Sequence, residues 1–223
     1  MKHYNSIPYW TSVELNQYCY AFEKYDGSCI RAEWERKQSK HSSNMGFRKF
    51  GTRQQMIDNP RHPFYEAAQI FVEKYAEPLD RLFYDSKEFR GIDTVTVYGE
   101  YFGPNSFAGW HEKEDEKDLI LFDIEKKVKG FLPPRIFVDM FGEFGIPRII
   151  YQGNLTEEFI NDIFEGKYDV DEGVVCKGTE HKKGKEVVWM CKCKTKEWLN
   201  KVKEKMGQKA LLEEFNGDVS MLF

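Results

Sequence analysis

The stretch FEKYDGSCIRAEWE, residues 22–35, carries the pattern that decides the fold. Residues 18–23 and 28–35 alternate in side-chain character with a period of two, which predicts two β-strands. KYDG (24–27) lies between them, and Asp-Gly is a strong signal for the tight turn of a β-hairpin. Taken alone, the stretch therefore predicts a hairpin with the amine of Lys24 exposed to solvent at its turn.

Strand-like stretches outnumber helical ones along the rest of the chain, and the two kinds do not alternate strictly. Further strands are expected at 47–53 (strand or loop), 94–103, 119–126, 147–153, 172–177 and 186–194. Helices are expected at 63–85 with a break before Pro78, 133–142, 154–166 and 195–207, and loops at 37–46 and in the tail from 208. Asn154 is expected to cap the third helix, with Glu157 three positions on. The pattern predicts an α+β fold of largely antiparallel sheets flanked by helices, in one domain over residues 1–223.

Composition places the chain among folded proteins, with 41% hydrophobic and 31% charged residues. No apolar run approaches the roughly 18 residues needed to span a membrane, and the amino terminus lacks the apolar core of a secretory signal. We therefore expect a cytoplasmic protein without a membrane partner. The net charge of −4 argues against indiscriminate nucleic-acid binding, yet the segments 31–53 and 177–209 are strongly basic. Each basic segment is either a solvated face or a phosphate-binding surface.

The five cysteines (Cys19, Cys29, Cys176, Cys191 and Cys193) are odd in number and include no CxxC pair. They are expected to be reduced, buried and inert. Strand alternation places Cys191 and Cys193 on one face, where they could bind a soft metal, although packing as small apolar side chains is favoured. The same alternation places Lys192 and Lys194 together on the opposite face.

Charged residues in the other strands also stand beside aromatic or apolar neighbours. Glu100 shares a face with Tyr98 and Phe102, and Glu172 and Lys177 stand at the two ends of one strand. A charge in a half-buried strand is usually paired or used, although a solvent-exposed position explains each residue taken singly.

The order of these elements along the chain is more informative than any one of them. EKYDGS, FGTR, YGEYFG, LFDI, DEGVVCKG and KCK follow one another in the order found in the covalent nucleotidyltransferases, the polynucleotide ligases and messenger-RNA capping enzymes. The chain most resembles RNA ligases of the RNA ligase 2 type, from about Tyr18 to about Leu199. The resemblance implies an ATP-grasp-like nucleotidyltransferase domain. It also implies an ATP-dependent enzyme, with magnesium or manganese, that joins 5′-phosphate and 3′-hydroxyl ends through lysyl-AMP.

The resemblance implies a role for each matching residue. Lys24 is the nucleophile, and Lys192 and Lys194 act on the phosphates. Glu172 is associated with the catalytic metal, and Glu100 engages the ribose or a metal. The other implied contacts to ATP are Glu23 beside the adenine, Phe122 stacked on the base, Arg53 on the ribose or phosphates, Lys177, and Ser28 and Arg31 near the phosphates, with Asp26 and Gly27 shaping the loop.

Elementary chemistry supports such a cluster independently of the resemblance. A lysine amine attacks phosphorus only when neutral, whereas an ordinary lysine, with a pKa of about 10.4, is protonated near pH 7. Partial burial and neighbouring cations would lower the pKa of Lys24, and the same cations would stabilise phosphate charge during the reaction.

Several alternatives remain open. Only 24 residues follow Leu199, so neither an OB-fold nor a separate carboxy-terminal domain is expected. Recognition of RNA ends or of a nicked duplex would then fall to the basic segments or to a partner protein. The alternatives are a minimal ATP-dependent DNA or RNA–DNA nick ligase, a capping-type GTP transferase, and a non-catalytic nucleotide or nucleic-acid binding module.

Overall fold

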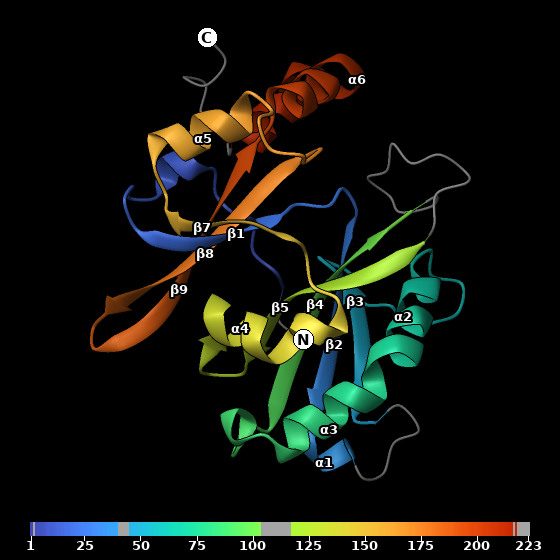
Figure 1. Ribbon diagram of the computed structural model, residues 1–223. Coiled ribbons are helices and arrows are strands. Elements are labelled where there is room, and N and C mark those ends of the chain that lie inside the picture. The colour runs from blue at the N-terminus through green and yellow to red at the C-terminus, as the bar shows by residue number, and fades with distance from the viewer. Residues whose placement is uncertain (2, 40–44, 104–116, 216, 218–223) are drawn as a thin grey trace. The chain divides into compact units, whose positions relative to one another are not determined.

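The computed structural model describes residues 1, 3–39, 45–103, 117–215 and 217, which form two compact units (Figure 1). Unit 1 comprises Met1–Tyr4, Asp26–Leu132 and Ile136–Ile146, and unit 2 comprises Asn5–Tyr25, Pro133–Arg135 and Pro147–Phe223. Each unit contains one sheet whose strands pair antiparallel, together with helices. The predicted α+β fold with antiparallel sheets is therefore confirmed.

Unit 1 is built on a five-stranded sheet in the order β3-β2-β4-β5-β6. Its strands are β2 (Ser28–Glu35), β3 (Phe47–Thr52), β4 (Thr94–Phe102), β5 (Asp118–Lys126) and β6 (Gly130–Phe131). The helical elements in this part of the chain are α1 (Arg36–Ser39), α2 (Tyr65–Phe71), the π-helical turn η2 (Val72–Ala76), α3 (Glu77–Asp85), η3 (Lys87–Phe89), α4 (Pro134–Phe141) and η4 (Gly142–Phe144). Buried aromatic side chains from strands and helices, among them Trp34, Phe47, Phe71 and Phe83, form the core.

The helix predicted for residues 63–85 forms with a local change of geometry at the expected place. The π-helical turn η2 ends immediately before α3, and Pro78 occupies the first turn of α3. The backbone stays helical from α2 through η2 into α3, so Pro78 lies inside a continuous helical run, where its missing N–H leaves one helical hydrogen bond unmade. The predicted break thus takes the form of a π-helical turn.

Unit 2 is built on a four-stranded sheet in the order β7-β1-β8-β9. Its strands are β1 (Tyr18–Glu23), β7 (Ile149–Asn154), β8 (Gly173–Lys182) and β9 (Lys185–Lys194), and its helices are η1 (Trp10–Ser12), α5 (Glu157–Phe164) and α6 (Lys196–Glu214). Phe159, Ile160 and Ile163 of α5 pack in one core cluster with Cys176 and Cys191 of the sheet. One face of the sheet is therefore apolar. The side chains at the intervening strand positions lie on the opposite face.

The predicted hairpin at residues 18–35 is wrong. β1 pairs with β7 and β8, whereas β2 pairs with β3 and β4 in the other sheet. The amide of Lys24 donates to the carbonyl oxygen of Gly173 at 2.9 Å, so the chain leaves β1 bonded to the start of β8. Both strands form where alternation predicts them, but the Asp-Gly signal does not determine their partners.

Other local expectations also change. Asn154 pairs with Tyr18 as the last residue of β7, and Thr156 caps α5 by accepting a hydrogen bond from the amide of Phe159 at 3.2 Å. The predicted cap at Asn154 is therefore wrong. Residues 37–39 belong to the short helix α1 where a loop was expected, and residues 40–44 of that loop lie outside the described residues, as do residues 104–116.

The last helix runs past its expected end at 207 to Glu214, interrupted at Gly207 by backbone angles of φ 83° and ψ 177°. Among the described residues, none of the helices has the length and apolar character needed to cross a bilayer.

Candidate active site

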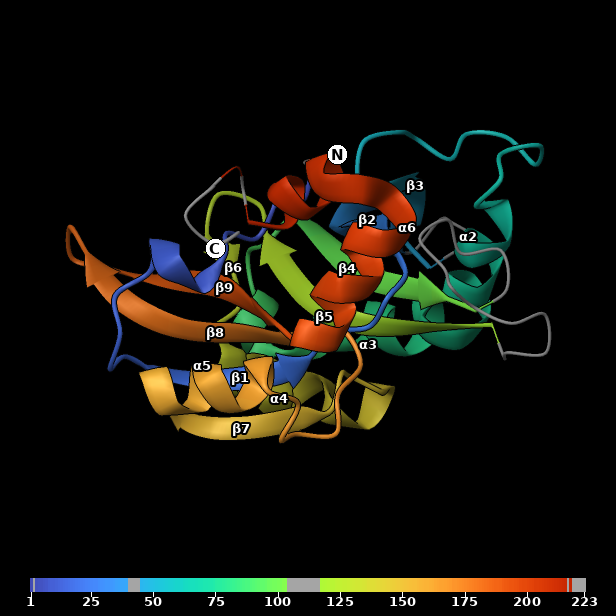
Figure 2. The same cartoon turned by 90° about the horizontal axis from the view of Figure 1, so that it is seen from above.

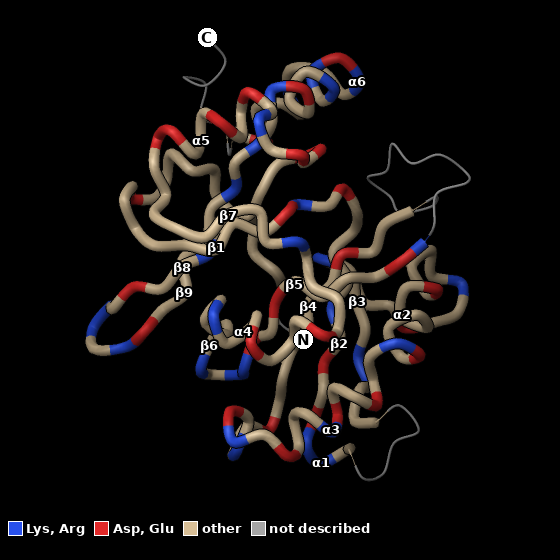
Figure 3. The backbone as a smooth tube through the Cα atoms, viewed as in Figure 1, with Lys and Arg blue, Asp and Glu red and all other residues tan. Residues whose placement is uncertain are grey.

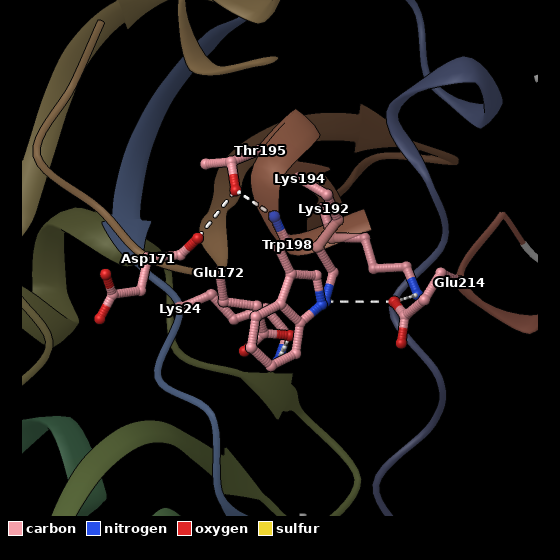
Figure 4. Close-up of polar contacts among 8 residues, drawn as sticks. All are labelled: Lys24, Asp171, Glu172, Lys192, Lys194, Thr195, Trp198 and Glu214. Carbon is pink, nitrogen blue, oxygen red and sulfur yellow. Dashed lines mark hydrogen bonds and ion pairs between the residues drawn. The ribbon is translucent and has the colours of Figure 1, made fainter. Parts of the chain in front are cut away.

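Lys24 and Glu172 form the centre of a charged cluster in unit 2 (Figure 4). The Nζ atom of Lys24, just beyond β1, lies 2.9 Å from Oε1 of Glu172, just before β8. Lys194, the last residue of β9, donates to the same Oε1 atom. The side chains of Glu172 and Lys194 are 5% and 1% exposed, whereas that of Lys24 is 26% exposed. The cluster is thus buried on one side and accessible at Lys24.

Glu214, at the end of α6, adds a second carboxylate to the cluster and pairs with the two lysines of β9. Its Oε2 atom lies 3.1 Å from the Nζ atoms of both Lys192 and Lys194. Burial lowers the pKa of Lys192, an effect that Glu214 opposes and that the ammonium groups of Lys194 and Lys24 reinforce. Burial opposes ionisation of Glu214, but Lys194 and Lys192 outweigh it and lower the pKa of the carboxyl to about 2.

Contacts of the Thr195 and Trp198 side chains at the start of α6 hold Lys194 in place. Thr195 caps the helix: its Oγ1 atom accepts from the amide of Trp198 at 3.1 Å and donates to the carbonyl of Asp171 at 2.8 Å. The Nζ atom of Lys194 lies 5.3 Å from the centre of the Trp198 ring, within cation–π range. Thr195 thus connects the end of β9, the start of α6 and the segment before β8.

Gly173 lets the two strands that carry the cluster approach each other closely. A β-carbon at this position would lie 2.1 Å from the carbonyl oxygen of Cys193 and 2.9 Å from the α-carbon of Lys194, and its φ is 139°. Only glycine fits such a position without a shift of the backbone.

One oxygen of the cluster has no partner. The Oε2 atom of Glu172 is buried and accepts no hydrogen bond within the part of the chain that the structure describes. A buried charged oxygen without a donor is costly, on the order of 1–3 kcal/mol or more. A hard divalent cation, which prefers carboxylate oxygens, would satisfy this atom. Glu172 therefore fits the metal-binding role predicted for it.

Lys177 and Glu23 also lie in unit 2, in the strands next to the cluster. Lys177 is buried, and its Nζ atom lies 5.2 Å from the centre of the Phe22 ring. Val175, two residues earlier on β8, pairs with Lys192, so Lys177 faces the same side of the sheet as Lys192. Glu23 is paired with Arg148, whose Nε atom lies 3.1 Å from its Oε2 atom.

The remaining predicted residues belong to unit 1, where three of them act electrostatically on one thiol. Burial raises the pKa of Cys29; Glu100 adds to this effect, and Arg53 and Arg31 oppose it. Arg31 is 1% exposed, and its Nε atom donates to the carbonyl oxygen of Thr52 at 2.5 Å. The structure thus groups Glu100, Arg31 and Arg53 within this unit.

Phe122 is half-buried in an aromatic group of the same unit. Its ring lies 5.2 Å from that of Tyr4 and 6.4 Å from that of Tyr98, with the latter pair stacked. Part of this side chain is therefore accessible for contact with a planar ligand.

The five cysteines are free, and four of them are buried as predicted, Cys29 being partly exposed. The Sγ atoms of Cys176, Cys191 and Cys193 lie within 4.8 Å of one another, close enough to bind one metal ion. They sit in the core cluster with the apolar side chains of α5. Packing as small apolar side chains explains why the three cysteines lie there, and it is the interpretation that the sequence favours over metal binding.

The basic segment 177–209 contains both buried lysines and lysines on the surface. Lys177, Lys192 and Lys194 are buried. Other lysines pair locally on the surface: Lys182 with Glu180, and Lys201 with Glu197. At the β8–β9 turn the basic positions lie at the tip with an acidic position on either side, and along α6 basic and acidic positions are intermixed (Figure 3).

Sequence reasoning missed several residues of the cluster: Gly173, Thr195, Trp198, Glu214, and Arg148 beside Glu23. Threonine directly before a helical stretch is a recognisable cap signal, so Thr195 could have been found. No comparable signal marks Glu214, which reaches the lysines only because α6 changes direction at Gly207.

Comparisons with known proteins identify the family and agree with the fold. Residues 17–194 match the profile of a protein family described as RNA ligase. No curated protein sequence matches the chain at a significant level. An apo structure of a point mutant of Naegleria gruberi RNA ligase is similar, with a TM-score of 0.62 and 17% identity, over 90% of this chain and 57% of that one.

Two further structures of the same Naegleria enzyme are also similar. The form with PPi has a TM-score of 0.60 and 17% identity, over 92% of this chain and 59% of that one. A point mutant with ATP and Mn has a TM-score of 0.58 and 17% identity, over 90% and 58%. Likeness at this identity shows a shared fold, and this chain spans less than two thirds of the length of those proteins.

Proposed function

This chain belongs to the RNA ligase family, and we propose that it is an ATP-dependent RNA ligase that joins 5′-phosphate to 3′-hydroxyl ends through lysyl-AMP at Lys24. The observation that carries the proposal is the contact between Lys24 and Glu172, 2.9 Å apart, with the amine of Lys194 on the same carboxylate oxygen. A binding module needs no nucleophile at this position.

In the first step, Nζ of Lys24 attacks the α-phosphorus of ATP and forms a nitrogen–phosphorus bond. The bond from that phosphorus to the bridging oxygen breaks, pyrophosphate leaves with the electron pair, and the amine loses its proton to solvent. An oxygen of an RNA 5′-phosphate then attacks the phosphorus of the bound AMP, the nitrogen–phosphorus bond breaks, and Lys24 recovers its amine. A 3′-hydroxyl next attacks the 5′-phosphate, its proton passes to solvent, and AMP leaves. This order is the one implied by the family resemblance.

Lys192 and Lys194 are suited to the phosphates in the first step. Both ammonium groups are buried, where a positive charge acts on a phosphate more strongly than it would in water. They can offset charge on the triphosphate and on the departing pyrophosphate. Lys177, on the same side of the sheet, extends this row of cations.

Glu172 would hold the divalent cation through its unpartnered Oε2 atom. When bound, magnesium or manganese supplies positive charge that offsets charge on the phosphates. With its carboxylate engaged in this way, Glu172 would give less support to the ammonium form of Lys24, which favours the neutral amine needed for attack. The Naegleria structure with ATP and Mn supports this choice of nucleotide and metal type.

The assignments made from sequence to the other residues remain part of the proposal. Glu23 and Phe122 would contact the adenine, Arg53 and Arg31 the ribose or phosphates, and Glu100 the ribose or a metal. The substrates would be RNA ends or a nicked duplex, with or without a partner protein for end recognition, in the cytoplasm. The five free cysteines are consistent with a reducing compartment.

Covalent labelling tests the first step. The protein is incubated with magnesium and with ATP or GTP labelled at the α-phosphate, denatured, and assayed for bound label. We expect ATP to label the protein, and Lys24→Ala to abolish the label. Lys201→Ala, which removes an exposed lysine of α6, is the matched control and should label normally. No label with either nucleotide would overturn the proposal, and a preference for GTP would indicate a capping-type transferase.

Sealing assays test the substrate. Nicked duplexes that differ only in RNA or DNA at the 3′-hydroxyl side are offered to the adenylylated protein. We expect faster sealing of the RNA ends. Equal sealing of DNA ends would contradict the RNA assignment and favour a minimal nick ligase.

A further inference from the structure

Glu214 forms ion pairs with Lys192 and Lys194, the two lysines that would bind phosphate in the proposed reaction. A single oxygen, Oε2, lies 3.1 Å from each of the two Nζ atoms of Lys192 and Lys194 (Figure 4). An anionic oxygen shared between two ammonium groups is also what a phosphate oxygen would provide. The carboxylate therefore stands where an anionic ligand would bind.

The net charge of the cluster, to which Glu214 contributes, determines how strongly it attracts a polyanion. Lys24, Lys192 and Lys194 contribute three positive charges, and Glu172 and Glu214 two negative ones, which leaves a net charge of +1. Without Glu214 the net charge would be +2, and the carboxylate would no longer repel an incoming phosphate.

Of the two carboxylates, Glu214 is the one able to leave. Glu172 is 5% exposed and lies next to Gly173, whose carbonyl oxygen accepts from the amide of Lys24 at 2.9 Å. The side chain of Glu214 is 27% exposed, and the residue lies in the part of α6 beyond the interruption at Gly207.

The interruption divides α6 into two helical pieces. The positive φ of 83° at Gly207 turns the chain, and the end of α6 runs in a different direction from its start (Figure 2). The second piece, 208–215, is held by two apolar residues, Leu211 and Phe215, both buried. Phe215 packs edge-on against Tyr9 with ring centres 5.0 Å apart. A small apolar anchor of this kind can release more easily than the sheet.

We propose that Glu214 occupies the position of a nucleotide phosphate oxygen on Lys192 and Lys194, and that binding of the polyphosphate displaces it by moving the segment 208–215. Nucleotide affinity is then set by competition between an internal carboxylate and the phosphates. The inference rests on the proposed function for the identity of the ligand, but it concerns polyphosphate binding and not ligation.

Binding of pyrophosphate measured by calorimetry tests the competition without any chemical step. Glu214→Gln keeps the size of the side chain and removes its charge, so we expect pyrophosphate to bind about tenfold more tightly. Glu214→Asp keeps the charge and should remain closer to the wild type. Glu213→Gln, at the neighbouring exposed carboxylate, is the matched control and should leave the affinity unchanged.

Unchanged or weaker binding by Glu214→Gln would overturn the proposal and would make Glu214 a residue that positions the lysines. Gly207→Ala provides a second variant, because a side chain at φ 83° is strained and disfavours the fold-back of the segment. We expect it to tighten pyrophosphate binding in the same direction. Weaker binding by this variant would count against displacement.

Hydrogen exchange measures the movement itself. Saturating pyrophosphate should speed amide exchange in 208–214 of the wild-type protein and leave α5 unchanged. Slower or unaltered exchange in 208–214 would overturn the displacement. If Lys24 fails to take label while Glu214→Gln still tightens pyrophosphate binding, the ligase proposal fails and this inference stands.

Discussion

Replacement of Lys194 with methionine removes the most buried charge of the cluster and nearly preserves side-chain length. Lys194 is 1% exposed, and its amine contacts Glu172 and Glu214. Among the residues that the structure describes, Glu172 would then keep Lys24 as its cationic partner and Glu214 would keep Lys192. The buried carboxylate of Glu172 would lose its most enclosed partner.

The expected cost follows from this loss of pairing. Removal of one partner from a buried ion pair costs about 3–5 kcal/mol, and the remaining contact with Lys24 argues for the lower end, about 3 kcal/mol. For a chain of 223 residues, each kcal/mol lowers the melting temperature by about 2–4 °C, which predicts a drop of about 6–12 °C.

Calorimetric melting of Lys194→Met beside Lys201→Met checks this magnitude. Lys201 also has one carboxylate within 2.9 Å, that of Glu197, but it is 44% exposed. An exposed pair on a helix contributes little to stability, so the control should melt within about 2 °C of the wild type. If the two variants melt at the same temperature, the burial and double pairing of Lys194 do not stabilise the fold as argued.

Three further predictions concern the same unit. Gly173→Ala should lose on the order of 3 kcal/mol in urea unfolding because its β-carbon would meet the carbonyl of Cys193. Gly184→Ala, with a positive φ but nothing within 4 Å, should lose about 1 kcal/mol, and equal losses would contradict the close approach of β8 and β9. Thr195→Ala should lose about 1 kcal/mol through its cap and Thr195→Ser should regain it; no regain would argue against capping. The pKa of Glu214 falls from 4.5 to about 2 on folding, so its stabilisation is complete above pH 4.5 and is lost as the pH falls towards 2. The stability difference between wild type and Glu214→Gln should therefore be constant from pH 5 to 7 and shrink towards pH 3, and a difference independent of pH would refute the pairing.

Prediction from sequence succeeded where the signal is local. Alternation located β1 and β2 at their observed bounds and placed Lys192 and Lys194 on one face, opposite Cys191. It failed at Asn154, because the pairing of this residue with Tyr18 keeps it in β7 and leaves the cap to Thr156. Several residues near Asn154 could cap a helix, and a contact with a strand more than 130 residues away decides among them.

The sequence alone thus determined the strands, the α+β class, the order of the motifs and the candidate nucleophile, because side-chain period is read within short windows and motif order is read directly along the chain. The tertiary structure decided which sheet each strand joins, and so replaced the expected hairpin at Lys24 with a bond to Gly173. It also brought Glu214 onto Lys192 and Lys194 from the far side of a helix interruption. Such contacts depend on burial and pairing between distant segments, for which propensities read over a few residues carry no information.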